Sequence, residues 1–259
     1  MSGVALVTGA GRGIGAATVA ALDAAGWSVV AVDRGADDPR VPYPLASRDE
    51  LEAVASRARE TVAVAGDATD PDEMAAAVAI AEERFGGLDA VVAAAGVIAG
   101  GVPAWEVPRE QEEAVLEVSL EGVLLAARVG VPALLRRPNP RRGRFVAVAS
   151  AAATRGLPML AAYCAAKAGV TGFVRALAVE LRGTGVTANA VSPGSTDTKI
   201  LDESARLYGL TDRDAFAPQQ PLERLIEPAE IAAAIAWLLG PGGDVVTGAA
   251  IPVDGGLSL

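Results

Sequence analysis

Tyr163 and Lys167 stand four residues apart in a stretch with a helical pattern, and this spacing places both side chains on one helix face. An ammonium held against a phenol favours the phenolate, which lowers the tyrosine pKa and makes Tyr163 a usable acid or base. A slim ammonium can lie under a phenol and also donate to a ribose hydroxyl, whereas a guanidinium is broad and forked. An isolated pair of this kind also occurs on ordinary amphipathic helices, so its meaning depends on the rest of the chain.

The composition removes several classes of mechanism. The 259 residues include no histidine and a single cysteine, Cys164, so we expect no Ser-His-Asp triad, no histidine-ligated metal and no internal disulfide. The net charge of −10 argues against a nucleic-acid partner. The chain shows no signal-peptide pattern and no uninterrupted apolar run of membrane-spanning length. These features predict a soluble, cytoplasmic protein.

Short apolar runs alternate with helical patterns along the whole chain. Continuous apolar strands separated by helices predict a parallel sheet covered on both faces and joined by right-handed crossovers. Residues 1–259 should therefore form a single α/β domain with a Rossmann-type, doubly wound sheet. Strands are expected at 4–8, 27–33, 61–67, 88–96, 143–150, 185–194 and 246–256, and helices up to about residue 25 and at about 49–60, 71–85, 109–136, 159–182 and 228–239.

A glycine-rich turn follows the first strand and opens the first helix, with glycines at positions 9, 11, 13 and 15. Such a turn lets the backbone approach a pyrophosphate at the helix amino terminus. Asp33 ends the second strand 18 residues after Gly15. A carboxylate placed there takes the adenosine ribose hydroxyls and repels a 2′-phosphate, so Asp33 favours NAD over NADP, although Arg34 beside it could welcome a phosphate.

Six motifs, in order and at matching spacing, resemble those of the short-chain dehydrogenase/reductase family over nearly the full chain. They are TGAGRGIG at 8–15, GDAT at 66–69, AAG at 94–96, Ser150, YCAAK at 163–167 and NAVSPGSTDT at 189–198. The resemblance implies catalytic roles for Ser150, Tyr163, Lys167 and Ser119. It implies NAD contacts from Gly9, Arg12, Gly13, Ile14, Gly15, Asp33, Arg34, Asp67, Ala68, Ala93, Ala95, Gly96, Tyr163, Lys167, Pro193, Gly194, Thr196 and Thr198.

Two positions depart from the family pattern. Ala93 and Ala94 replace asparagines, which removes side-chain hydrogen bonds and leaves backbone contacts. Ser119 stands where the family has an asparagine that holds a water linking the lysine to solvent. Serine is shorter, so proton exchange should be slower or follow another route.

Two long connections interrupt the regular alternation. Residues 35–48 form an insertion beside Asp33, and its run at 38–46 looks like the insertion of the mycofactocin-coupled, carveol dehydrogenase-like branch. Members of that branch are thought to keep NAD bound and to pass electrons to mycofactocin. An insertion there could fold over the adenosine, or it could be a surface elaboration. Residues 195–227 are the predicted substrate lid, because they follow the carboxyl end of a strand.

The expected reaction is reversible hydride transfer between a hydrophobic alcohol and NAD, with Tyr163 taking the hydroxyl proton. Two alternatives remain open: a 3-oxoacyl carrier-protein reductase, which Asp33 opposes because such an enzyme would prefer NADPH, and a non-catalytic NAD-sensing module. The resemblance also implies a homotetramer through the helices near 109–136 and 159–182 and the last strand. The candidates for an apolar substrate pocket are Ile98, Trp105, Leu157, Met159, Tyr208 and Phe216.

Overall fold

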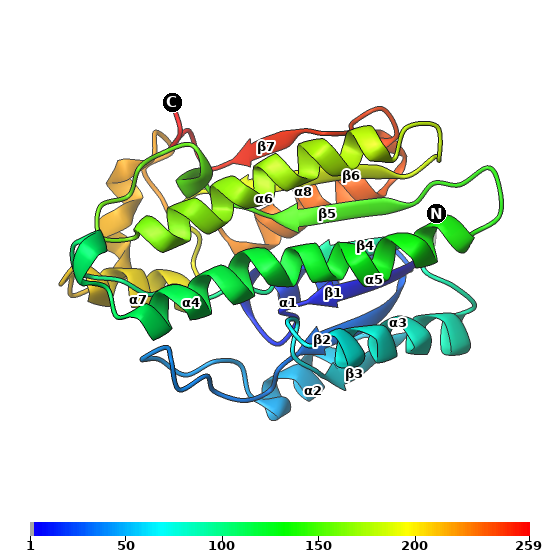
Figure 1. Cartoon of the computed structure of the whole chain (residues 1–259), viewed down its shortest axis with the longest axis horizontal. Coiled ribbons are helices and arrows are strands. Elements are labelled where there is room, and N and C mark those ends of the chain that lie inside the picture. Colours follow the sequence, from blue (N-terminus) through cyan, green and yellow to red (C-terminus); the bar gives the residue numbers. More distant parts are fainter. Residues whose placement is uncertain (1–2) are drawn as a thin grey trace.

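The computed structural model describes residues 3–259 and contains a seven-stranded parallel sheet with strand order β3-β2-β1-β4-β5-β6-β7 (Figure 1). The predicted doubly wound fold is confirmed, and every predicted strand is present near its expected position. The strands are shorter than the apolar runs because the run ends lie in the connecting turns. Their bounds are β1 Val4–Thr8, β2 Ser28–Asp33, β3 Thr61–Ala65, β4 Ala90–Ala93, β5 Arg144–Val148, β6 Thr187–Pro193 and β7 Ala250–Val253.

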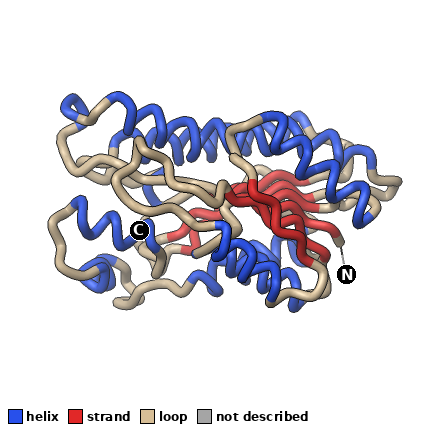
Figure 2. Tube along the Cα trace, turned by 90° about the horizontal axis from the view of Figure 1, so that it is seen from below, coloured by secondary structure: helices blue, strands red, loops and turns tan. Residues whose placement is uncertain are grey.

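Helices cover both faces of the sheet, as the view along its edge shows (Figure 2). Two apolar clusters fill the space between sheet and helices, one on each face. The first face carries α1 Gly13–Ala24, α2 Arg48–Ser56 and α8 Pro228–Leu239. The second carries α3 Pro71–Phe85, α4 Arg109–Leu116, α5 Gly122–Arg136 and α6 Ala161–Glu180.

Local capping signals fix where the helices begin and end. Asp70 accepts hydrogen bonds from the first-turn amides of α3, Pro71 occupies the first helical position, and Gly86 ends the helix with φ of 80°. Ser47 and Glu50 form a capping box that starts α2. The insertion therefore ends at Ser47, and we call residues 35–47 the strap.

The long helix predicted over 109–136 is present, but a π-helical turn, Glu117–Glu121, separates α4 from α5. By length and composition Arg109–Arg136 is the one helix among residues 3–259 that could cross a membrane. Half of its apolar window is buried, and it packs beside α3 and α6 against the sheet. Burial of this kind is typical of the core helix of a doubly wound fold.

Three irregular segments gather where the strands end, at the left of Figure 1. They are the strap, residues 94–101 after β4, which we call the β4 loop, and residues 195–227. The last segment contains α7 Lys199–Leu207 and the short helix η4 Arg213–Gln219. Ligands of doubly wound folds bind beyond the carboxyl ends of the strands, so these segments surround the expected site.

Candidate active site

A cavity of about 610 Å³ opens at the carboxyl ends of the strands. It is large enough for a drug-sized ligand or cofactor. Among the residues predicted from sequence to act in catalysis or to contact NAD, all but Ser119 and Ala93 line this cavity. The motifs that are far apart in the chain therefore meet around one space.

The glycine turn holds its backbone close to the β4 loop. Gly9 has φ of 65°, and a Cβ added there would lie 2.8 Å from the backbone of Ala95. A Cβ at Gly15 would lie 2.0 Å from the carbonyl oxygen of Gly9. Side chains at these positions would clash with the backbone, so the glycines allow the tight turn on which a pyrophosphate could bind.

Asp33 lies at the end of the cavity where an adenosine would bind. Its Oδ2 accepts a hydrogen bond from the amide of Gly11 at 2.9 Å. Burial raises the pKa of Asp33, and the bond from Gly11 lowers it in part. Arg34 donates to Asp38 at 2.9 Å and lies 3.6 Å from Asp67. Two carboxylates thus balance the charge of Arg34, which weakens its attraction for a phosphate.

The catalytic candidates come from β5 and α6. Ser150 follows β5, and its side chain hydrogen-bonds Tyr163. Lys167 is 4% exposed, and its Nζ donates to the carbonyl of Val148 at 2.8 Å. The same Nζ lies 5.7 Å from the centroid of the Tyr163 ring. The predicted trio therefore shares one corner of the cavity, with the lysine beneath the tyrosine ring.

Burial dominates the electrostatics of this corner. It lowers the pKa of Lys167 to about 8, because desolvation disfavours the ammonium. Burial also raises the pKa of Tyr163, while the hydrogen bond with Ser150 lowers it. The prediction that Lys167 lowers the pKa of Tyr163 is wrong for this structure. The ammonium is directed to Val148, and desolvation of the phenol has the largest effect.

Ser119 lies in the π turn behind the cavity wall and is fully buried. Its hydroxyl donates to the carbonyl of Val97 at 3.0 Å and accepts from the amide of Val97 at 3.1 Å. Ala93 is the last residue of β4, pairs with Thr8 of β1 and packs into the core. Neither residue lines the cavity. The backbone contact of Ala93 to NAD and the role of Ser119 in proton exchange remain predictions.

The substrate end of the cavity is apolar, as predicted. Ile98, Leu157, Tyr208 and Phe216 line it, and the rings of Tyr208 and Phe216 meet edge to face with centroids 6.0 Å apart. Residues that sequence reasoning missed also contribute, including Leu201 and Ser204 of α7. They lay within the predicted lid, but the mixed polar pattern of that segment did not mark which side chains turn inward.

Two of the predicted pocket residues lie elsewhere. Trp105 is 84% exposed because the short helix η1 Ala104–Glu106 carries it outward from the β4 loop. Met159 has φ of 60°, and its carbonyl accepts a hydrogen bond from the amide of Gly101 at 3.1 Å. The backbone of Met159 therefore supports the end of the β4 loop, while its side chain does not line the cavity.

The sequence predicted the strap beside the adenosine end of the cavity. In the structure it reaches beyond that end. Arg12 of the glycine turn donates to the carbonyl of Pro44 at 2.7 Å, and Leu45 lines the cavity. Val41 is buried in an apolar cluster with residues of the β4 loop, α4 and α6. The hydroxyl of Tyr43 accepts a hydrogen bond from the amide of Ile98 at 2.9 Å. The strap thus runs along the cavity from the glycine turn to the substrate wall.

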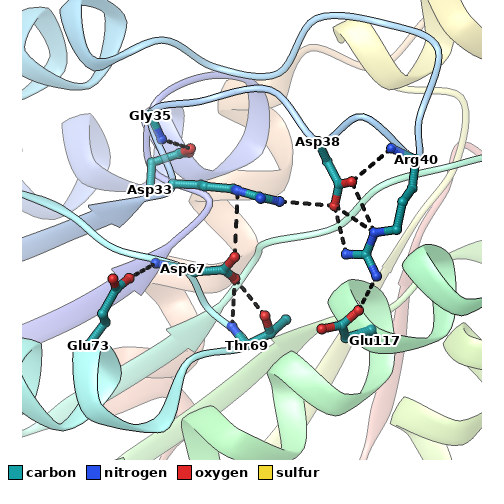
Figure 3. Close-up of polar contacts among 9 residues, drawn as sticks. Asp33, Gly35, Asp38, Arg40, Asp67, Thr69, Glu73 and Glu117 are labelled. Carbon is teal, nitrogen blue, oxygen red and sulfur yellow. Dashed lines mark hydrogen bonds and ion pairs between the residues drawn. The ribbon is translucent and has the colours of Figure 1, made fainter.

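A charged cluster fastens the strap to the long helix (Figure 3). Asp38 is 2% exposed and accepts hydrogen bonds from Arg34 and Arg40, and Arg40 also pairs with Glu117 of the π turn. These interactions, led by the bond from Arg40, hold the pKa of Asp38 at about 2. We call Arg34, Asp38, Arg40 and Glu117 the latch.

The profile of the family described as Enoyl-(Acyl carrier protein) reductase matches residues 9–258. The chain belongs to the short-chain dehydrogenase/reductase family. The predicted enzyme class, an NAD-dependent oxidoreductase, is confirmed. No group of three or more side chains that could hold a metal ion gathers among residues 3–259.

Three members of the family illustrate the similarity. The chain is 37% identical to a cis-4-hydroxycyclohexanecarboxylate dehydrogenase of Sinomonas cyclohexanicum, over 98% of this chain and 95% of the other. A carveol dehydrogenase of Mycobacterium avium, solved in complex with NAD, superposes with a TM-score of 0.92 and 30% identity, covering 98% and 97% of the two chains. A 3-ketoacyl-(acyl-carrier-protein) reductase of Brucella melitensis, complexed with NADH, gives 0.87 and 31%, covering 99% and 98%.

Proposed function

We propose that this dehydrogenase interconverts a cyclic secondary alcohol and its ketone with NAD. The observation that carries the proposal is an apolar pocket end, including Ile98, Leu157 and Phe216, in the same cavity as the Ser150, Tyr163 and Lys167 corner. Two relatives are named for alcohols on six-membered carbon rings, carveol and 4-hydroxycyclohexanecarboxylate, and their names support this substrate class. The proposal includes a cytoplasmic location and assembly into a homotetramer.

The protein's own groups have distinct tasks in this reaction. NAD, when bound, supplies the ring carbon that accepts hydride from the alcohol. In the oxidation direction Tyr163 acts as the phenolate, after its own proton has left to solvent, and takes the hydroxyl proton of the alcohol. In reduction the neutral phenol gives this proton to the carbonyl oxygen. Ser150 hydrogen-bonds both the substrate oxygen and Tyr163, and this stabilises the negative charge that develops on the substrate oxygen. Lys167 donates one N–H to the carbonyl of Val148. Its other two N–H groups can donate to the nicotinamide ribose and toward the Tyr163 hydroxyl.

The strap supports a finer proposal, that NAD stays bound between turnovers and is re-oxidised in place by an external acceptor such as mycofactocin. A free coenzyme must leave after each turnover, which requires the adenosine end to open. Here the latch, the Arg12 contact to Pro44 and the Tyr43 contact to Ile98 tie the strap down along the cavity. Each tie must break before the dinucleotide can leave past the strap.

The test is exchange of the coenzyme. Protein purified without added nucleotide is examined by native mass spectrometry, then incubated with isotopically labelled NAD⁺ for hours. The proposal predicts one unlabelled NAD per chain that persists through the incubation. An empty site, or exchange complete within seconds, would sink the retained-coenzyme proposal and leave an ordinary dehydrogenase that uses soluble NAD.

A 3-oxoacyl thioester reductase is the second candidate, and the similarity to the Brucella enzyme with NADH favours it. The two candidates differ in what the pocket must admit. A thioester on a carrier arm needs an open channel to the surface, whereas a ring alcohol is enclosed. Comparing kcat/KM for acetoacetyl thioesters and for substituted cyclohexanols decides between them. A non-catalytic sensor would turn over neither, and the intact Ser150, Tyr163 and Lys167 speak against it.

A further inference from the structure

Three side chains from three different elements hydrogen-bond the backbone of the β4 loop. Thr8 of β1 and Ser119 of the π turn hold its first half. Tyr43 of the strap holds the second half through the amide of Ile98, across 55 positions of sequence. The β4 loop forms one wall of the substrate pocket. It is therefore held partly by the strap, which lies beside the cofactor site.

Tyr43 is well suited to a fixed structural contact. Its ring packs in the apolar cluster that also contains Val41, Val97 and Tyr163. Burial raises the pKa of Tyr43 and outweighs the bond from the Ile98 amide and the charge of Arg12, which lower it, so the side chain remains a neutral phenol. A neutral hydroxyl accepts from a backbone amide without bringing a charge into the pocket wall. Tyr43 does not itself line the cavity.

Ile98 is the residue through which Tyr43 reaches the substrate. Its side chain lines the cavity and is otherwise buried, at 1% exposure. A buried amide without an acceptor is costly, so the position of the Ile98 backbone depends on the hydroxyl opposite it. The position of the Ile98 side chain follows its backbone, because close packing leaves little room to compensate.

We infer that Tyr43 is a positioning residue for the substrate: its hydroxyl fixes Ile98 and thereby makes the strap part of the alcohol pocket as well as of the cofactor site. This inference rests on the proposed alcohol oxidation for its kinetic consequence. Opening of the strap withdraws the hydroxyl from Ile98, so release of the coenzyme also disorders the substrate wall. Closure over the coenzyme completes the pocket.

Tyr43→Phe is the variant that tests this, because it keeps the ring and removes only the acceptor. We expect KM for a cyclic alcohol to rise roughly five-fold, the loss of one hydrogen bond, with kcat and its pH profile unchanged. Hydrogen exchange followed by mass spectrometry should show faster exchange in the peptide that contains Ile98. Release of NAD should also become roughly two- to five-fold faster, because the bond to Ile98 is one of the contacts that hold the strap along the cavity.

Glu117→Gln is the matched comparison, since it weakens the latch and leaves the Tyr43 hydroxyl in place. It should speed release of NAD and leave exchange at Ile98 as in the wild type while NAD is bound. Unchanged exchange at Ile98 and unchanged KM in Tyr43→Phe would overturn the inference. Failure of the wild type to oxidise any cyclic alcohol would instead sink the proposed function, and the exchange measurement would still decide whether Tyr43 orders the loop.

Discussion

The Ser119 hydroxyl makes two hydrogen bonds to one residue, donating to the carbonyl of Val97 at 3.0 Å and accepting from its amide at 3.1 Å. A hydroxyl has a single proton to donate, and Val97 takes it. The Lys167 ammonium only donates, so a contact with it would have to use the second lone pair of the Ser119 hydroxyl. A Cβ added to Gly96 would lie 3.5 Å from both side chains. Ser119, at the position where the family motif has asparagine, therefore holds the β4 loop in place through Val97.

Replacing Ser119 with alanine should destabilise the protein. The variant leaves a buried amide and carbonyl of Val97 without these partners, so the free energy of unfolding should fall by about 1–3 kcal/mol. Urea denaturation measures the change. Ser56→Ala is the matched control, because the Ser56 hydroxyl bonds a carbonyl at an exposed helix end. An equal loss of unfolding free energy in both variants would show that the Ser119 hydrogen bonds to Val97 have no special stabilising role.

Replacing Lys167 with methionine should abolish turnover and stabilise the nucleotide-free protein at pH 7. Burial lowers the pKa of Lys167 from 10.5 to about 8, so its burial costs stability in full below pH 8. Between pH 8 and 10.5 the unfolded chain holds the proton more tightly, and the cost disappears as pH rises. We expect a gain of about 1–3 kcal/mol in the free energy of unfolding at pH 7 that shrinks toward pH 10. Chemical denaturation of wild type and variant across this range tests it, and a difference that grows with pH would refute it.

Conversion to NADP use should require more than loss of Asp33. Asp33→Ser removes the carboxylate that repels a 2′-phosphate, yet Arg34 stays engaged by Asp38 and Asp67. Asp33→Ser/Asp38→Asn frees the guanidinium from its closer partner, so we expect the double variant to bind NADP about ten-fold more tightly than the single one. Isothermal titration with NADP compares them. Equal affinities would show that Asp38 has no part in coenzyme choice.

The latch should slow departure of the coenzyme. Arg40 and Glu117 are each about one-third exposed, so their pair is weakened by solvent and its loss in Glu117→Gln should speed release of NAD by only about two- to five-fold. Glu113→Gln removes an exposed pair with Arg109 on the same long helix and serves as the control. Release is followed by the loss of labelled NAD from each protein. The same rate in both variants would rule out the latch.

Much of the fold could be predicted because its signals are local. Apolar runs marked the strands, and the helical pattern at about 71–85 agrees with α3, whose ends are set by Asp70 and Gly86. The four-residue spacing of Tyr163 and Lys167 placed both at the cavity for the same reason. The π turn at 117–121 escaped prediction because one added residue in a helix scarcely changes its apolar pattern.

The parts of the site that depend on distant contacts could not be predicted. The pKa of Tyr163 is raised by desolvation, which depends on what packs around the ring rather than on its neighbour in the helix. Tyr43 gains its role from Ile98, a residue in another loop. Trp105 looked like a pocket residue by type, but the turn that carries it leads outward. Sequence pattern reports which residues are apolar, and the tertiary fold decides which of them face the cavity.

The most direct test of the account is a single-turnover experiment with the coenzyme already on the protein. NAD-loaded wild type is mixed with an excess of a cyclic secondary alcohol, and NADH absorbance is followed with no free coenzyme present. With Tyr163 as the catalytic base, we expect a rapid rise toward one NADH per chain, and a rise slower by roughly 10²–10⁴-fold in Tyr163→Phe with the same NAD content. No NADH from the wild type with any cyclic alcohol, or an equal rate in Tyr163→Phe, would contradict it.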